Sequence, residues 1–229
     1  MGYFGSKGGA GVFHLIVAAM PRHDVYIETH LGGGAVMLAK PLSARSIGID
    51  IDFDALMAFR LGAGAGHECL LHSGDCVAFL EGFDFASAGR VLIYADPPYV
   101  LSTRTSAQRY GFDYTDADHR RLIACLRALP ADVMVSGYPS ALYDELLGDW
   151  GSVAFQAMTR GGVRTEKLWT NFELGAAHWA TFAGRDYIDR QRIKRKAAKW
   201  AEMFERCPSG ERLALLAALL AVEAKPPAT

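Results

Sequence analysis

The chain has 229 residues, a formal net charge of −1, 51% hydrophobic residues and 21% charged residues. This length and composition can bury a substantial core, which excludes a disordered protein and predicts one α/β domain with an appendage. Because the net charge is near zero, the overall charge gives no reason to expect nucleic-acid binding, although basic residues gather in one segment near the C-terminus.

The cysteines and the two ends of the chain predict the cellular setting. Four cysteines form no CxxC pair and no metal-ligand spacing with histidines, namely Cys69, Cys76, Cys125 and Cys207. Residues 1–7 lack the apolar core of a signal peptide, and the apolar run at 213–222 is too short to cross a bilayer. We therefore expect a soluble, cytoplasmic protein with reduced thiols, no metal and no membrane partner.

Predicted strands and helices alternate along most of the chain. The predicted strands are 25–29, 46–50, 69–73, 91–96, 133–138, 153–158 and 167–174, and the predicted helices are 12–20, 35–40, 53–61, 116–129 and 141–147. Apolar strands that alternate with helices predict a mainly parallel sheet with helices on both faces. In such a sheet the carboxyl ends of the strands share one edge, where ligands bind.

A glycine-rich turn follows the first predicted strand, which ends near Glu28. The next residues read THLGGG, so that Gly32, Gly33 and Gly34 stand directly before a predicted helix. Glycines at this place let the backbone approach a ligand closely, and a simple tight loop is the alternative. The pattern matches neither the GxGxxG dinucleotide fingerprint nor a phosphate-binding P-loop.

Acidic residues end the second and third predicted strands. Asp50 follows the segment SIGI, and Asp75 follows LLHSG. An acid about twenty residues past a glycine turn commonly binds a ribose diol, because a carboxylate accepts two hydroxyl protons. Asp75 is suited to accept a hydrogen bond from an adenine amino group. Either acid alone is also typical of a cap or turn, but glycines or acids at successive strand ends predict one ligand site.

The most informative motif is Asp96-Pro97-Pro98-Tyr99, which follows the apolar run VLIYA. The two prolines stop the strand, because proline has no N–H to donate and a fixed φ. Asp96 can accept hydrogen bonds from an amino group, the proline backbone offers carbonyls, and Tyr99 can stack on a planar base. This set suits the exocyclic amine of a flipped-out nucleobase. The alternative is an ordinary strand-end turn with a surface tyrosine.

The order of these motifs resembles that of the Dam-like N6-adenine-specific DNA methyltransferases, which use S-adenosylmethionine. The resemblance spans residues 3–172 and includes two further blocks, YFGSK at 3–7 and EKLWTN at 166–171. The related protein-glutamine methyltransferases carry Asn in place of Asp96. The resemblance implies a Rossmann-like methyltransferase fold with a mostly parallel seven-stranded sheet and helices on both faces. We expect this catalytic domain at residues 1–182 and a C-terminal helical appendage with a basic helix at 183–229.

The resemblance also implies the cofactor site. Glu28 and the three glycines would surround the methionine part of S-adenosylmethionine, Asp50 would hold the ribose hydroxyls, and Asp75 would bind the adenine. Lys7 would contact the cofactor or the motif loop. The implied cofactor-binding residues are Lys7, Glu28, Gly32, Gly33, Gly34, Asp50, Asp75 and Asp96.

The motif residues would carry the chemistry. Asp96 and the Pro97 carbonyl would accept hydrogen bonds from the target amine, and Tyr99 would stack on the extruded adenine. The implied catalytic residues are Asp96, Pro97, Pro98 and Tyr99. The methyl group would pass directly to N6 and leave S-adenosylhomocysteine, without a metal or a covalent enzyme intermediate.

Two departures from the family concern packing and specificity. Thr29 and His30 stand where the family usually has Pro-Phe. The interval between Asp75 and Asp96, where Dam-like enzymes usually insert a target-recognition domain, has room only for a helix and a turn. If a target sequence is read at all, the loop at 100–114 or the C-terminal segment must read it.

Both of these segments carry the residue types that contact nucleic acids. The loop mixes cations and aromatic rings, namely Arg104, Arg109, Tyr110 and Tyr114, and a mobile surface lid is its alternative interpretation. Residues 185–199 hold seven basic and two acidic residues. Its predicted phosphate contacts are Arg192, Lys194, Arg195 and Lys196. An apolar face on this segment would dock on the domain, and a second helix is predicted at 211–223. The alternative to DNA contact is a solvated amphipathic helix, for example at an oligomer interface.

The predicted function is methylation of adenine N6 in DNA, with S-adenosylmethionine as cofactor. The expected partner is double-stranded DNA with the target adenine flipped out, with or without a cognate restriction endonuclease. One alternative keeps the chemistry and takes adenine in RNA as substrate. The other is a non-catalytic DNA-binding protein that retains the fold, against which the intact Asp96 motif argues. Tyr138 is expected to line the same cleft, while Trp169 and Phe172 either wall it or pack in the core.

Overall fold

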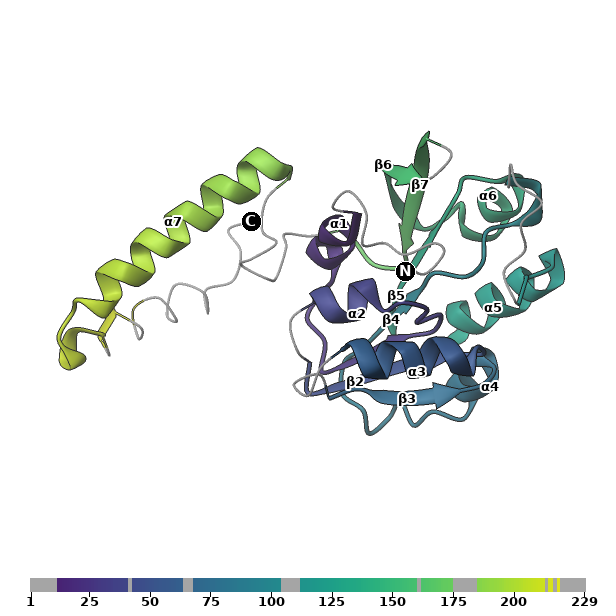
Figure 1. The fold of residues 1–229 in the computed structure, drawn as a ribbon, viewed down its shortest axis with the longest axis horizontal. Coiled ribbons are helices and arrows are strands. Elements are labelled where there is room, and N and C mark those ends of the chain that lie inside the picture. The colour runs from purple at the N-terminus through teal and green to yellow at the C-terminus, as the bar shows by residue number, and fades with distance from the viewer. Residues whose placement is uncertain are drawn as a thin grey trace. The chain divides into compact units, whose positions relative to one another are not determined.

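The structure is a computed structural model that describes residues 12–40, 43–63, 68–103, 112–159, 162–174, 185–212, 214–215 and 218. The chain divides into two compact units, residues 1–179 and 180–229, where the sequence suggests a boundary at 182. The described residues of the first unit form a seven-stranded sheet in the order β3-β2-β1-β4-β5-β7-β6. Helices cover this sheet on both of its faces (Figure 1).

Five strands form parallel pairs, a sixth runs in the same direction as these five, and the remaining strand is antiparallel to both of its neighbours. The parallel strands are β1 (Val25–Glu28), β2 (Arg45–Asp50), β3 (Leu70–Ser73), β4 (Val91–Ala95) and β5 (Asp132–Gly137). β7 (Gly162–Thr170) runs antiparallel to β5 and forms a hairpin with β6 (Gly151–Thr159). Every residue of β1 and β4 is buried, which explains their nearly uninterrupted apolar sequences.

Five helices of the first unit agree with the predicted ranges to within a residue at each end. They are α1 (Val12–Ala19), α2 (Ala35–Ala39), α3 (Phe53–Gly62), α5 (Asp116–Ala128) and α6 (Ala141–Leu147). Two more elements, α4 (Cys76–Glu81) and the short 3₁₀ helix η1 (Leu101–Thr103), had no predicted range, although the sequence leaves room for a helix after Asp75. α5 begins with a capping box, in which the Thr115 hydroxyl and the Asp118 carboxylate each satisfy the other residue's backbone N–H.

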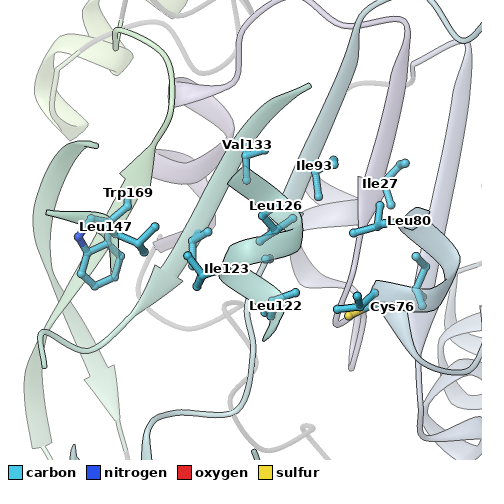
Figure 2. Close-up of a cluster of buried hydrophobic side chains, with 14 of the residues drawn as sticks. Ile27, Cys76, Leu80, Ile93, Leu122, Ile123, Leu126, Val133, Leu147 and Trp169 are labelled. Atoms are coloured by element: carbon cyan, nitrogen blue, oxygen red, sulfur yellow. The ribbon is translucent and has the colours of Figure 1, made fainter. Parts of the chain in front are cut away.

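The main core lies between one face of the sheet and α4, α5 and α6 (Figure 2). Its fully buried side chains from the sheet and these helices include Ile27, Ile93, Val133, Leu122, Ile123, Leu126 and Leu147. Tyr26 and Tyr94 are also fully buried but face the other side, because successive side chains of a strand alternate. Lys40, at the end of α2, lies 4.6 Å above the Tyr26 ring, so this helix covers the second face.

One strand prediction was wrong in position. The seventh strand extends from Gly162 to Thr170 and not from 167 to 174. Its polar first half, which includes Arg164 and Glu166, pairs with β6 along the whole hairpin. Backbone pairing with a neighbouring strand therefore decides its limits, whereas the sequence pattern followed only the more apolar part.

The second unit contains α7 (Tyr187–Glu205), which is capped by the Asp186 carboxylate at the Asp189 N–H. None of the residues of α7 is buried, and large apolar side chains of this helix, such as Tyr187 and Trp200, are exposed. Helical backbone begins again at Ser209, somewhat earlier than predicted, and most of the predicted second helix lies outside the described residues. Within the described parts of both units, no helix has the length and apolar character needed to span a membrane.

Candidate active site at the carboxyl edge of the sheet

A pocket of about 310 Å³ opens at the carboxyl ends of β1, β2 and β4. It lies at the point where the strand order changes direction, between β1 and β4, and its size is in the range of small-molecule sites. The structure brings ten of the predicted site residues to its walls, namely Glu28, Gly32, Gly33, Gly34, Asp50, Asp75, Asp96, Pro97, Pro98 and Tyr99. Three other predicted site residues lie outside the described residues, namely Lys7, Arg104 and Arg109.

The glycine turn requires glycine at two of its positions. Gly32 and Gly34 have φ angles of 47° and 62°, which other residues rarely adopt. A Cβ atom on Gly34 would also lie 2.2 Å from the ring of Phe59. The turn therefore brings bare backbone to the pocket wall, as the sequence predicts.

Asp50 ties the end of β2 to the glycine turn. One of its carboxylate oxygens accepts a hydrogen bond from the Gly32 N–H at 2.7 Å, and the other accepts from the Asp52 N–H at 2.9 Å. Burial raises the pKa of Asp50, while these backbone hydrogen bonds act in the opposite direction. Each oxygen has a second lone pair, so the fixed carboxylate has the capacity to accept two further protons from a diol.

Glu28 is a buried carboxyl group on the pocket wall. Its Oε2 accepts a hydrogen bond from the Tyr26 hydroxyl at 2.9 Å. Burial raises the pKa of Glu28 to about 8, the negative charge of Asp96 acts in the same direction, and Lys40 acts against it. Glu28 is therefore largely protonated at neutral pH in the absence of a cationic partner.

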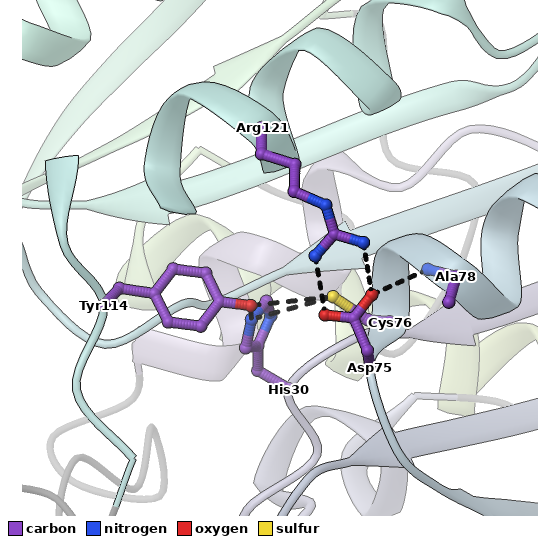
Figure 3. Close-up of polar contacts among 6 residues, drawn as sticks. All are labelled: His30, Asp75, Cys76, Ala78, Tyr114 and Arg121. Carbon is purple, nitrogen blue, oxygen red and sulfur yellow. Dashed lines mark hydrogen bonds and ion pairs between the residues drawn. The ribbon is translucent and has the colours of Figure 1, made fainter. Parts of the chain in front are cut away.

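Asp75 forms the pocket wall beyond β3 and is held by three hydrogen bonds (Figure 3). Arg121 of α5 donates to both carboxylate oxygens, at 2.9 and 2.8 Å, and the Ala78 N–H donates to Oδ1 at 2.8 Å. The Arg121 guanidinium holds the pKa of Asp75 below its usual value, which keeps the carboxylate charged. The sequence pattern points to Asp75 but offers no signal for its partner.

Asp96 directly follows β4 and is held from behind by β5. Its Oδ1 accepts a hydrogen bond from the Ser136 hydroxyl at 2.7 Å, and the Ser136 oxygen lies 2.9 Å from the Tyr94 hydroxyl. Ser136 and Tyr94 are both fully buried. The carboxylate is therefore presented at the pocket wall in a defined orientation.

Tyr99 is held by both β7 and the end of β5. Its hydroxyl donates to Oε1 of Glu166 at 2.9 Å, and its ring stacks on Tyr138 at a centroid distance of 4.0 Å and an angle of 23°. Tyr138 thus stacks on Tyr99 and is not one of the residues that line the pocket, contrary to the prediction. Tyr138 therefore covers one face of the Tyr99 ring, and only the other face can stack on a bound base while this contact persists.

His30 and Tyr114 close another part of the pocket wall. One His30 ring nitrogen lies 2.8 Å from the Thr29 hydroxyl. The other lies 2.9 Å from the Tyr114 hydroxyl, and the Cys76 sulfur lies 3.8 Å from the same Tyr114 oxygen (Figure 3). Burial lowers the pKa of His30 to about 3, so its ring is neutral. Polar contacts therefore replace the Pro-Phe packing that is usual at residues 29 and 30 in the resembled family.

Trp169 belongs to the core and not to a base pocket. It is 1% exposed and packs edge-to-face on Tyr143 at 5.2 Å. Neither Trp169 nor Phe172 lines the pocket. Of the two interpretations of Trp169, core packing is confirmed.

The strand order, the antiparallel β7 and the pocket at the carboxyl edge define the class: the first unit has the Rossmann-like fold of the S-adenosylmethionine-dependent methyltransferases. No protein-family model matches the chain, and no curated protein matches it in sequence.

Several solved structures are similar to this chain at low sequence identity. One is a precorrin-8w decarboxylase from Methanobacterium thermoautotrophicum, with 16% identity over 70% of this chain and 89% of that chain and a TM-score of 0.46. Another is a dimethyladenosine transferase from Plasmodium falciparum, with 15% identity over 71% and 62% of the two chains and a TM-score of 0.45. A third is an rRNA methylase from Streptococcus thermophilus, with 13% identity over 69% and 93% and a TM-score of 0.45.

Proposed function

We propose that the protein transfers a methyl group from S-adenosylmethionine to the N6 amine of adenine in DNA, in the manner of the Dam-like methyltransferases it resembles. One observation carries the proposal. Asp96 and Tyr99, at the end of β4, lie on the same pocket as the glycine turn and the strand-end acids of β1 and β2. A carboxylate that can accept a hydrogen bond from an amine and an aromatic ring therefore lie beside polar groups that suit a nucleoside cofactor.

The hydrogen-bond acceptors of the pocket fit the polar parts of this cofactor. Glu28, beside the glycine turn, would accept from the ammonium group of the methionine part. Asp50 would accept from the two ribose hydroxyls, since its carboxylate is already oriented by two backbone N–H groups. Asp75 would accept from the exocyclic amine of the cofactor's adenine, as a carboxylate kept charged by Arg121.

The residues at the end of β4 suit an amine substrate. S-adenosylmethionine, held by Glu28, Asp50 and Asp75, would supply a methyl group on a sulfonium sulfur that leaves as a neutral thioether, and the methylated amine would release one proton to water. Asp96 would accept a hydrogen bond from the amine and stabilise the positive charge that develops on nitrogen. The Pro97 carbonyl would be a second acceptor, and Pro98 restricts the backbone that carries it.

Direct transfer is supported by the state of the cysteine in the pocket. Cys76 lines the wall, but burial raises the pKa of its thiol to about 11. A neutral thiol is a poor nucleophile, so this residue is unsuited to a covalent intermediate.

The partner in this proposal is double-stranded DNA, and α7 would contact the phosphates of the DNA backbone. Lys194, Arg195 and Lys196 are exposed, and Arg192 is exposed as well although it pairs with Asp189 at 2.8 Å. Exposed cations along one helix suit a phosphate backbone, which carries a regular row of negative charges.

The test is transfer of labelled methyl from S-adenosylmethionine to duplex DNA, single-stranded DNA and RNA, followed by identification of the modified nucleoside. N6-methyladenine in DNA, absent with Asp96→Ala and present with the exposed control Asp54→Ala, is the expected result. Label in RNA alone would move the substrate to RNA. Cofactor binding without transfer to any of the three would overturn the catalytic proposal in favour of a binding protein.

A further inference from the structure

The side chains of Asp96 and Tyr99 are each held by residues that lie behind the pocket wall. Ser136 has a single hydroxyl proton and donates it to Asp96, so the Tyr94 hydroxyl must donate in turn to Ser136. The three groups thus form a directed chain from Tyr94 through Ser136 to the carboxylate. Because Ser136 and Tyr94 are fully buried, water does not compete for these hydrogen bonds.

A separate set of contacts holds Tyr99. Glu166 of β7 is 2% exposed and accepts a hydrogen bond from the Tyr99 hydroxyl, while Tyr138 stacks on one face of the Tyr99 ring. A hydroxyl anchor at one end and a stacked ring on one side leave little rotational freedom to the aromatic plane. The antiparallel pairing of β5 with β7 brings these holders together, since Gly137 of β5 lies opposite Lys167 of β7.

We propose that Ser136 and Glu166 are positioning residues for the methyl transfer, Ser136 for the carboxylate of Asp96 and Glu166 for the ring of Tyr99. This inference rests on the proposed function and assigns roles to two residues outside Asp96–Tyr99, of which Glu166 begins the EKLWTN block. The two residues act on different steps. Ser136 acts through the group that contacts the reacting amine, so its loss lowers kcat, whereas Glu166 acts through the ring that receives the base, so its loss raises the KM for nucleic acid.

The test of Ser136 compares Ser136→Ala with the conservative variant Ser136→Thr and the matched control Ser140→Ala, which loses only the N-cap of α6. Ser136→Ala is expected to lower kcat at least about tenfold with unchanged affinity for S-adenosylmethionine. Ser136→Thr keeps the hydroxyl and is expected to recover most of the rate, and Ser140→Ala to keep the wild-type rate. If Ser136→Ala does not fold, Tyr94→Phe removes the upstream donor alone and is expected to give a smaller loss of kcat in the same direction.

The test of Glu166 compares Glu166→Ala with Glu166→Gln, which keeps an acceptor oxygen, and with the exposed control Glu173→Ala. Glu166→Ala is expected to raise the KM for nucleic acid at least about tenfold with a smaller change in kcat, and Glu166→Gln to retain most of the wild-type KM. If both alanine variants lower kcat and raise the KM by the same factors, the result would indicate general destabilisation and overturn the assignment.

A structural readout separates this inference from the proposed function. Crystal structures of the wild type, Ser136→Ala and Glu166→Ala without substrate are compared at Asp96 and Tyr99. The expected result is a turned Asp96 carboxylate in the first variant and a displaced Tyr99 ring in the second, even if no methyl transfer is detected with any substrate. Unchanged side chains in both variants would overturn the positioning role, whatever the enzyme's substrate.

Discussion

Arg121 binds both carboxylate oxygens of Asp75, at 2.9 and 2.8 Å, on the wall of the pocket. The two side chains are 52% and 40% exposed, so this ion pair contributes little to the stability of the fold. Its two parallel hydrogen bonds do restrict the orientation of the carboxylate, as bidentate pairs do. The relationship therefore has its main consequence for ligand binding.

We expect Arg121→Ala to weaken S-adenosylmethionine binding about tenfold, which corresponds to about 1.4 kcal/mol. The free energy of unfolding should change by no more than about 1 kcal/mol, because the pair is exposed. Calorimetric titration and denaturant unfolding measure the two effects. Arg120→Ala is the matched control, since Arg120 lies beside Arg121 on α5 and makes a similar bidentate contact, with Glu145 of α6, without lining the pocket. Equal affinities of the two variants would contradict the role of Arg121.

The buried carboxyl group of Glu28 should make stability depend on pH. Its pKa is raised to about 8 by burial, so the folded state holds a proton that the unfolded chain has lost at about pH 4.5. The sign follows from proton uptake: the stabilisation is present at low pH and declines as pH rises from about 4.5 to 8. Glu28→Gln should remove this decline, on the order of a few kcal/mol. Unfolding at pH 5, 6.5 and 8 measures the difference, and parallel curves for the two proteins would contradict it.

Gly34 should not tolerate a side chain. Gly34→Ala would combine a φ of +62° with a Cβ atom 2.2 Å from the Phe59 ring, which is expected to cost more than about 2 kcal/mol and to distort the turn that lines the pocket. Gly62→Ala is the control, because a Cβ there meets nothing within 4 Å and lies in a helix, so it should be neutral or stabilising by up to about 1 kcal/mol. Thermal unfolding ranks the two, and a reversed order would refute the steric argument.

Replacement of the four basic residues of α7 tests its contact with DNA. A variant with alanine at Arg192, Lys194, Arg195 and Lys196 should bind duplex DNA more weakly and with a shallower dependence of log affinity on log salt. The slope should fall by about 0.9 for each phosphate that the variant no longer neutralises. Affinity for S-adenosylmethionine should not change, because the pocket belongs to the other unit. Arg120→Ala with Arg127→Ala serves as the control for loss of exposed charge. A salt dependence equal to that of wild type would exclude α7 from the interface.

The main elements of the candidate site could be predicted from local pattern alone. Glu28, Asp50 and Asp96 each come at or directly after the end of a strand, and parallel strands bring their carboxyl ends to one edge whatever their spacing along the chain. The glycines at 32 and 34 show where the backbone must adopt a left-handed turn. Those features are properties of short segments, so the amino-acid sequence determines them by itself.

Only the tertiary structure decided which side chains hold these groups. Arg121 is separated from Asp75 by 46 positions, Ser136 from Asp96 by 40, and Glu166 from Tyr99 by 67. Their contacts depend on strand order, on the register of β5 with the antiparallel β7, and on the face to which each side chain points. A shift of one residue in register turns every side chain of a strand to the opposite face. The partners of the site residues are therefore set by pairing between distant strands and helices, which no local pattern encodes.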